Sequence, residues 1–352
     1  MGLKILHTAD WHLDSPFAGF TQEQRQYLKQ EQAKLPQRIV ELCRQEGCDL
    51  MLLAGDLFDG QPSRDTVQGL KMTLAQAGVP VFIAPGNHDF CQPGSPWLEE
   101  TWPDNVTVFT GNLESVVVES LDCRVYGAGF RGMDCPALLE DFQAAGEERY
   151  CVAVLHGDPT QVNSPYNPVT AAQVRNSGLD YLALGHIHKA GAFRAGDTLC
   201  AWPGCPMGRG WDETGDKGVC IVTLDGPAQI QAVGLDGPRF LEEHVDAGAD
   251  PAGAVEAVLP AAGNLDFYRV YLEGDGPVDV SQLHFPGFPN LEVVDHTQPP
   301  LEVWPDAGED TLEGVYFHLL RQLMQEHPEL ENQVQLAALI SRKLLSGREV
   351  TL

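Results

Sequence analysis

The chain has 352 residues, of which 43% are hydrophobic and 20% are charged. This length suits one sizeable domain with one or two smaller ones, and the composition is that of a soluble globular protein. Apolar runs fall short of the roughly 20 residues that cross a membrane, and a strand-like segment begins so close to Met1 that we expect no signal peptide. Nine cysteines without a Cys-x-x-Cys pair indicate reduced thiols and a cytoplasmic protein.

The charge of the chain limits its partners. Acidic side chains outnumber basic ones 50 to 22, which gives a formal net charge of −28. Such a charge repels nucleic acid at long range. If DNA is the substrate, positive charge has to come from bound metal ions, from a few local arginines such as Arg131 and Arg209, or from another subunit.

Strands and helices alternate through the first two thirds of the chain. We predict strands at 3–8, 49–54, 79–84, 116–118, 124–126, 150–155, 181–184, 198–202 and 217–224, and helices at 21–46, 64–76, 136–145 and 169–177. Pro36 is expected to kink or divide the first helix. The short strands after residue 106 suggest a second sheet packed on the first, so the pattern indicates a layered α/β domain.

The remainder of the chain predicts smaller units. Strands near 228–235, 239–245, 268–273 and 291–295, with a helix near 251–259, indicate a separate small α/β unit. A linker rich in proline and acidic residues spans 298–310, and two amphipathic helices separated by Pro328 follow it. We therefore divide the chain into a main domain (1–225), a small domain (226–300), and a linker with C-terminal helices (301–352).

Five short polar motifs each follow a predicted strand. They are Asp10-x-His12, Gly55-Asp56, Gly86-Asn87-His88-Asp89, His156-Gly157 and Gly185-His186-x-His188. Because ligands of open α/β sheets bind at the carboxyl ends of the strands, we expect these side chains to meet. Carboxylate, carboxamide and imidazole together suit Mn²⁺, Fe²⁺ or Zn²⁺ better than Ca²⁺ or Mg²⁺. A single motif of this kind is usually an ordinary strand end, but all five in order indicate a two-metal hydrolase in which two ions share Asp56.

These motifs resemble those of the calcineurin-like metallophosphoesterase superfamily and cover residues 1–224. More narrowly, the segments 6–13 and 54–59, with Pro62 and Ser63, resemble the SbcD-type DNA repair exonucleases, in particular a short bacterial, YhaO-like branch. The resemblance implies an α/β fold in which a two-sheet sandwich forms the metallophosphoesterase catalytic domain. It also implies a small α/β capping domain at 226–300 and a C-terminal helical pair.

The resemblance also implies roles for individual residues. Two divalent metal ions would be held, with Mn²⁺ as the first choice and iron or zinc as alternatives. The first ion would take Asp10, His12, Asp56 and His188, and the second would take Asp56, Asn87, His156 and His186. His88 would stabilise the transition state or protonate the leaving oxygen, and Asp89 would orient it. Some family members carry a further histidine where this chain has Asp59, which we expect to cap the next helix.

By this resemblance the protein is a metal-dependent DNA exonuclease or endonuclease of DNA repair that activates a water with two metal ions. The family's catalytic protein works as a homodimer beside an SMC-like coiled-coil ATPase (SbcC-like), which the C-terminal helices would dock, although they could equally pack on their own domain. A stand-alone phosphatase or phosphodiesterase acting on a small nucleotide or phosphoprotein stays open, as does a non-catalytic scaffold. The long portion after residue 225 favours the nuclease, and the complete set of expected ligands disfavours the scaffold.

Overall fold

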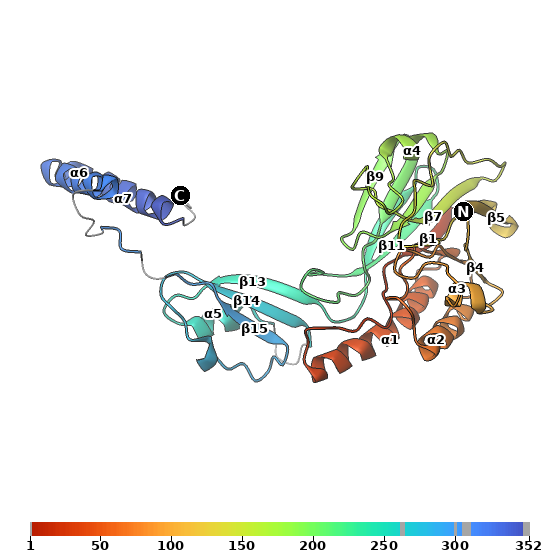
Figure 1. Cartoon of the computed structure of the whole chain (residues 1–352), viewed down its shortest axis with the longest axis horizontal. Coiled ribbons are helices and arrows are strands. Elements are labelled where there is room, and N and C mark those ends of the chain that lie inside the picture. Colours follow the sequence, from red (N-terminus) through yellow and green to blue (C-terminus); the bar gives the residue numbers. More distant parts are fainter. Residues whose placement is uncertain (1, 261–264, 299–300, 305–310, 348–352) are drawn as a thin grey trace. The chain divides into compact units, whose positions relative to one another are not determined.

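The computed structural model describes residues 2–260, 265–298, 301–304 and 311–347 (Figure 1). Backbone contacts separate two compact units, Met1–Leu241 and Glu242–Leu352. The N-terminal unit contains both large sheets and all five polar motifs.

The first sheet has six strands in the order β12-β11-β1-β2-β3-β4. These strands are β1 (Leu3–Thr8), β2 (Leu50–Leu53), β3 (Val81–Ile83), β4 (Val106–Val108), β11 (Gly218–Leu224) and β12 (Gln229–Gly234). The strands from β1 to β4 run parallel, whereas β11 and β12 are antiparallel additions at one edge. All four residues of β2 are buried, which accounts for its uninterrupted apolar sequence.

The second sheet also has six strands, in the order β5-β6-β7-β8-β10-β9. They are β5 (Glu114–Val118), β6 (Cys123–Gly127), β7 (Tyr150–His156), β8 (Tyr181–Gly185), β9 (Gly191–Ala195) and β10 (Thr198–Trp202). One apolar core joins the two sheets, with Ile5 and Leu52 from the first packed with Val125, Val152 and Ala183 from the second. The predicted two-sheet α/β sandwich is therefore confirmed.

Helices cover the outer faces of this sandwich. Figure 1 shows α1 (Gln22–Gln45) and α2 (Arg64–Ala75) side by side near the first sheet, and α4 (Ala171–Asn176) near the second. Two shorter elements are α3 (Pro96–Glu99), a single helical turn, and η1 (Glu119–Leu121), a 3₁₀ turn. Helix α1 begins at Thr21, whose side chain and that of Gln24 form a capping box. Pro36 lies inside α1, and the helix continues through it undivided.

Three expectations about local structure differ from what is found. Residues 136–145 form turns rather than a helix, because their backbone groups bond elsewhere: the Tyr126 hydroxyl bonds both backbone groups of Ala145, and Asn167 accepts from the N–H of Leu138. Strand β9 was not predicted, and β4 pairs with β3 in the first sheet, although the short strands after residue 106 were expected to form the second. Strand β12 was expected in the small α/β unit. It instead pairs with β11, so the first sheet extends beyond residue 225.

The C-terminal unit contains a helical pair and a three-stranded sheet, whose first strand begins just before the boundary between the units. The sheet runs β13 (Phe240–Asp246), β14 (Phe267–Glu273) and β15 (Leu291–Asp295), with α5 (Pro251–Val258) against it and η2 (Val280–Gln282) after β14. Helices α6 (Leu312–Glu326) and α7 (Glu331–Leu345) follow, with η3 (Pro328–Leu330) between them. Among the described residues, no helix is both long and apolar enough to cross a membrane. The assignment of functional domains along the chain stays a prediction.

Candidate metal centre

The loops that follow β1 and β2 run side by side and carry the first candidate ligands. The N–H of Asp10 donates to the carbonyl of Gly55 (2.9 Å), and the N–H of His12 donates to the carbonyl of Asp56 (2.9 Å). Asp10, His12 and Asp56 have φ angles of 56°, 46° and 51°, in the left-handed region. This backbone conformation, which non-glycine residues seldom adopt, turns the three side chains away from the strand directions and toward one point.

Asp56 lies at that point. Its carboxylate is buried, and Oδ1 accepts the backbone N–H of His88 (2.9 Å). Its Oδ2 is 3.3 Å from Nε2 of His156 and 3.9 Å from Nε2 of His12. Asp56 therefore faces imidazoles on two sides, as a carboxylate shared by two ions must.

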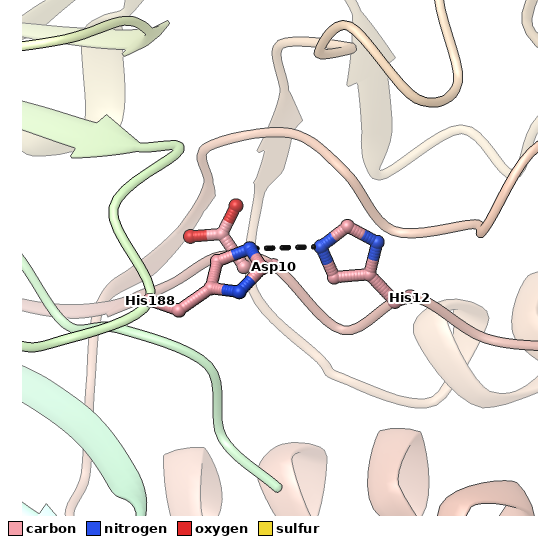
Figure 2. Close-up of side chains that lie close together, drawn as sticks. All are labelled: Asp10, His12 and His188. Carbon is pink, nitrogen blue, oxygen red and sulfur yellow. Dashed lines mark hydrogen bonds between the residues drawn. The ribbon is translucent and has the colours of Figure 1, made fainter. Parts of the chain in front are cut away.

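On the first side lie Asp10, His12 and His188, drawn in Figure 2. The Nε2 atoms of the two histidines are only 3.1 Å apart. Two nitrogens that bind one tetrahedral ion at about 2.1 Å are about 3.4 Å apart, so this separation suits a shared metal ion. The Asp10 carboxylate also accepts the backbone N–H of His186 at 3.0 and 3.1 Å, which ties β1 to the loop after β8.

On the second side lie Asn87, His156 and His186. Oδ1 of Asn87 is 3.0 Å from Nε2 of His156 and 3.2 Å from Nδ1 of His186. The Nδ1 of His156 must donate to the carbonyl of Ala54 (2.9 Å), since a carbonyl only accepts. The Nε2 lone pair of the neutral ring therefore faces the oxygens of Asp56 and Asn87, and only a cation or a proton between these atoms makes the arrangement stable.

Glycines make room for these contacts. Gly55 has a φ of +89°, and a Cβ there would lie 2.6 Å from Nδ1 of His156 and 2.8 Å from the carbonyl of Ala84. A Cβ on Gly86 would collide with Asp56 and His156. Glycine is needed at both positions, because any larger residue would displace a ligand.

The electrostatics of the centre call for positive charge. Burial lowers the pKa of His12 and lowers that of His186 to about 4, so both rings are neutral and able to ligate. Burial raises the pKa of Asp10. For Asp56, the attraction of His156 outweighs burial and lowers the carboxyl pKa, while the same pairing raises the pKa of His156 to about 9. Two buried carboxylates so close together need a cation, and the mixed nitrogen and oxygen donors fit divalent metal ions.

Comparison with known proteins agrees with this geometry. The family model described as calcineurin-like phosphoesterase matches residues 3–190, more than half of the chain. The chain belongs to the calcineurin-like phosphoesterases. All seven candidate ligands lie inside the matched region.

Two curated relatives of this calcineurin-like phosphoesterase are informative. The chain is 32% identical over 239 residues to an uncharacterized metallophosphoesterase, YhaO, of Bacillus subtilis, a match that covers 62% of this chain and 57% of that protein. It is 33% identical over 107 residues to one of the proteins that make up nuclease SbcCD in Staphylococcus saprophyticus, covering 28% and 27%. The chain thus spans little more than half of the first relative and about a quarter of the second. A dimetal phosphatase of Danio rerio is similar in fold, with 13% identity, coverage of 66% of this chain and 96% of that one, and a TM-score of 0.46.

The candidate ligands of this phosphoesterase centre are supported by three residues that sequence reasoning missed, and by Arg209, which it named only as a source of positive charge for DNA. Oε1 of the buried Glu213 accepts a hydrogen bond from Nδ1 of His188 (2.7 Å), and Nη2 of Arg209 lies 2.8 Å from the same oxygen. Asn167 donates to the carbonyl of His156 (2.8 Å), and Gln32 donates to that of His12 (2.9 Å). The Glu213 contact fixes the orientation of the His188 ring and raises its basicity, whereas Asn167 and Gln32 hold the backbone of His156 and His12 in place. The three missed residues lie in loops or on α1, where no pattern in the sequence marks them.

Asp59 does not cap a helix in this phosphoesterase, contrary to our expectation. Ser63 caps α2 by accepting the N–H of Thr66. Oδ1 of Asp59 instead lies 3.2 Å from Nδ1 of His88, and its Oδ2 accepts from the hydroxyl of Ser15 (3.1 Å). The hydrogen bond that Asp59 accepts from Nδ1 raises the pKa of His88, whose side chain is 43% exposed at the rim of the centre.

Asp89 does not orient His88, which corrects the role that we expected for it. Its buried carboxylate accepts the backbone N–H groups of Leu57 (2.8 Å), Phe58 (3.3 Å) and Gly86 (2.8 Å). Burial, with the charge of Asp56 nearby, raises the carboxyl pKa of Asp89 to about 7. Asp89 therefore fixes the loops after β2 and β3 to each other, and the orienting contact belongs to Asp59.

Proposed function

We propose that this phosphoesterase hydrolyses DNA phosphodiesters with the help of two divalent metal ions. The observation that carries the proposal is the shared position of Asp56 between two sets of ligands, with His88 at the open rim. Asp10, His12, Asp56 and His188 would hold one ion, and Asp56, Asn87, His156 and His186 the other. When bound, such a pair of ions supplies Lewis-acid activation of water and neutralises charge on the phosphate.

His88 would handle the proton of the leaving group. Its Nδ1 must donate to Asp59, because a carboxylate oxygen only accepts, and this contact favours the doubly protonated ring. The N–H at Nε2 is then left to donate to the oxygen that departs from phosphorus. Asp59 would hold the ring in that orientation and would not itself touch the substrate.

Two observations bear on the substrate. The match to a protein of nuclease SbcCD from Staphylococcus saprophyticus supports DNA, although it covers only 28% of this chain. The net charge of −28 favours the alternative, a phosphatase or phosphodiesterase acting on a small nucleotide or a phosphoprotein. For DNA, the positive charge would come from the two ions and from a partner.

A comparison of substrates tests the proposal. The purified protein is incubated with linear duplex DNA or with bis(p-nitrophenyl) phosphate, each with Mn²⁺ and with chelator. We expect both substrates to be hydrolysed with Mn²⁺ and neither with chelator. Hydrolysis of the chromogenic ester alone would support the small-substrate alternative, and hydrolysis that survives chelation would contradict both.

We propose Mn²⁺ as the native metal, with iron or zinc as alternatives. The ligands combine carboxylate and carboxamide oxygens with imidazole nitrogens, a mixture that these ions share. Metal analysis of protein purified without chelator, followed by reconstitution with each ion, tests this choice. Full activity with zinc but not with Mn²⁺ would contradict it.

We also propose that the protein works in the cytoplasm as a homodimer beside a coiled-coil ATPase. Nine free cysteines support a reducing compartment. Helices α6 and α7 are joined by a hydrogen bond between Tyr316 and Ser341 (2.7 Å), yet they carry several exposed apolar side chains suited to a helical partner. These include Leu312, Val315, Leu319, Leu323, Leu336, Leu344 and Leu345. Light scattering tests the dimer, and a pull-down in which no long coiled-coil protein is recovered would contradict the partner.

A further inference from the structure

A small cavity opens beside His88, at the rim of the candidate metal centre. Its volume is about 170 Å³, and its walls include Phe58, Gln61, His88, Phe90, Gln92 and Ser95. Drug-sized ligands occupy pockets of about 300–1,000 Å³, so this cavity has room for one ring system rather than for a whole nucleotide.

The walls suit a neutral, planar group. Phe90 is the aromatic residue nearest His88 in the chain among the lining residues, and the amides of Gln61 and Gln92 can donate and accept hydrogen bonds, although that of Gln61 also donates to the carbonyl of Gly94 (3.4 Å). The ionisable residues that line the cavity are His88 and Asp89, and the Asp89 carboxylate already accepts three backbone N–H groups. No lysine or arginine is among its described lining residues, and the protonated ring of His88 already has the Asp59 carboxylate as its partner, so the cavity is a poor site for a phosphate.

The cavity is formed in advance rather than left to loop motion. The indole of Trp97 packs against Phe58, with 5.1 Å between ring centroids, and donates to the carbonyl of Asp89. The N–H of Cys91 donates to the carbonyl of Phe130 (2.8 Å), which anchors the segment that carries Phe90. Ser95, another wall residue, has a buried hydroxyl with no hydrogen-bond partner among the described residues.

We propose that this cavity binds the base of the nucleoside that leaves when a DNA phosphodiester is cut. His88 lines the cavity and, under the proposed function on which this inference rests, faces the leaving oxygen. The group attached to that oxygen would therefore lie toward the cavity. A nucleobase is planar and carries both donors and acceptors at its edges, so it matches Phe90 and the two glutamine amides.

Three dinucleotides test this assignment with Mn²⁺ present. One is thymidylyl-thymidine, and in each of the other two a tetrahydrofuran abasic residue replaces one thymidine, on one side or the other of the phosphate. We expect the wild type to lose about tenfold in kcat/KM, through KM, with one abasic dinucleotide and not with the other. F90A should cut thymidylyl-thymidine about as poorly as the wild type cuts the sensitive abasic substrate.

Two further variants and the separate outcomes make the test decisive. Q92A should show a smaller loss of the same kind, and L98A, which removes an exposed side chain on α3 outside the cavity, should behave as wild type. Equal cleavage of all three dinucleotides by the wild type, or an unchanged preference in F90A, would overturn the subsite while leaving the proposed hydrolysis intact. If bis(p-nitrophenyl) phosphate is also not hydrolysed, the proposed function falls and the subsite with it.

Discussion

The two sides of the candidate metal centre are held by different means. On the first side, His188 is 28% exposed and donates to the Glu213 carboxylate, which Arg209 also contacts. On the second side, His156 is fully buried and donates to the backbone carbonyl of Ala54. One ligand thus depends on charged side chains in a loop, and the other depends on the path of the main chain after β2.

This difference indicates how each side responds to change. A carboxylate partner makes the imidazole a stronger metal ligand. A single substitution can remove that carboxylate. A backbone carbonyl persists in every variant that keeps the fold. The first side should therefore be the one whose metal affinity can be tuned, and the second side should be lost only with the local fold or with the ligands themselves.

The substitution expected to break both sides at once is D56N. An amide cannot bridge two cations as a carboxylate does, so both ions should bind weakly. Hydrolysis should fall by about a thousandfold or more, because the ions supply several kcal/mol of charge stabilisation. Metal analysis and phosphodiesterase assays measure the two effects, with circular dichroism to confirm folding. Retention of both ions would show that Asp56 is not shared.

Replacing His88 tests a group that belongs to neither side. H88A should keep both ions and the fold but lose about 10²–10⁴-fold in kcat on DNA, the usual contribution of a general acid. The loss should be much smaller for a p-nitrophenyl ester, because p-nitrophenolate leaves without a proton. D59N should show a weaker loss with the same dependence on leaving group. Equal losses on both substrates would contradict proton donation by His88.

The comparison is sharpened by E213Q. The amide oxygen still accepts the hydrogen bond from His188 but brings no charge, so the affinity of the first side for its ion should fall by about 10–100-fold. The ion on the second side should stay. Metal titration followed by calorimetry resolves the two events. E100Q, which alters an ion pair with Lys71 away from the centre, serves as the matched control. Equal weakening of both ions would mean that the sides are not supported independently.

The smallest expected effect concerns a residue that links the strands leading to both sides. His7 on β1 donates through Nε2 to the carbonyl of Leu184 (3.0 Å) and accepts from the Tyr181 hydroxyl (2.7 Å). Burial lowers its pKa to about 3, against 6.5 for the exposed group. Between about pH 6.5 and pH 3, His7 is protonated in the unfolded chain but neutral in the folded chain. Lowering the pH through this range therefore destabilises the fold.

Between pH 6.5 and 5.5 this group alone should remove about 1 kcal/mol of unfolding free energy. The measurement is the pH dependence of urea unfolding in the wild type and in H7Q, which cannot titrate in this range. Over this pH unit the unfolding free energy of the wild type should fall by about 1 kcal/mol more than that of H7Q, because the other groups of the two proteins titrate alike. Parallel curves would mean that His7 can be protonated in place.

Sequence reasoning found the strands and ligands whose physical basis is local. Apolar runs such as β2 and β8 stand out because both faces of these parallel strands are buried, and a polar residue after such a run lies at a fixed edge of the sheet. That is why the seven candidate ligands could be named and why the structure brings them together. Which ion each one binds stays a prediction.

The rest depends on contacts between loops, which no periodicity records. Glu213 lies in a loop without a motif, and nothing in the sequence marks its approach to His188. Asp59 was assigned to a helix end on spacing alone, whereas Asp14, distant in sequence, accepts the N–H of the true cap residue, Ser63. The segment 136–145 has helical composition, but side chains from other elements take its backbone hydrogen bonds.

The left-handed backbone at Asp10, His12 and Asp56, with His186 at a φ of 100°, has a thermodynamic consequence. Each such residue stores about 1–3 kcal/mol of conformational energy that the surrounding fold must sustain. Cations that bind only the folded arrangement offset this energy by mass action, so the melting temperature should rise with metal concentration. The backbone geometry that positions the candidate ligands is thereby coupled to the free energy of unfolding. A substitution that relaxes this backbone would raise the stability of the metal-free protein and lower its affinity for the ions.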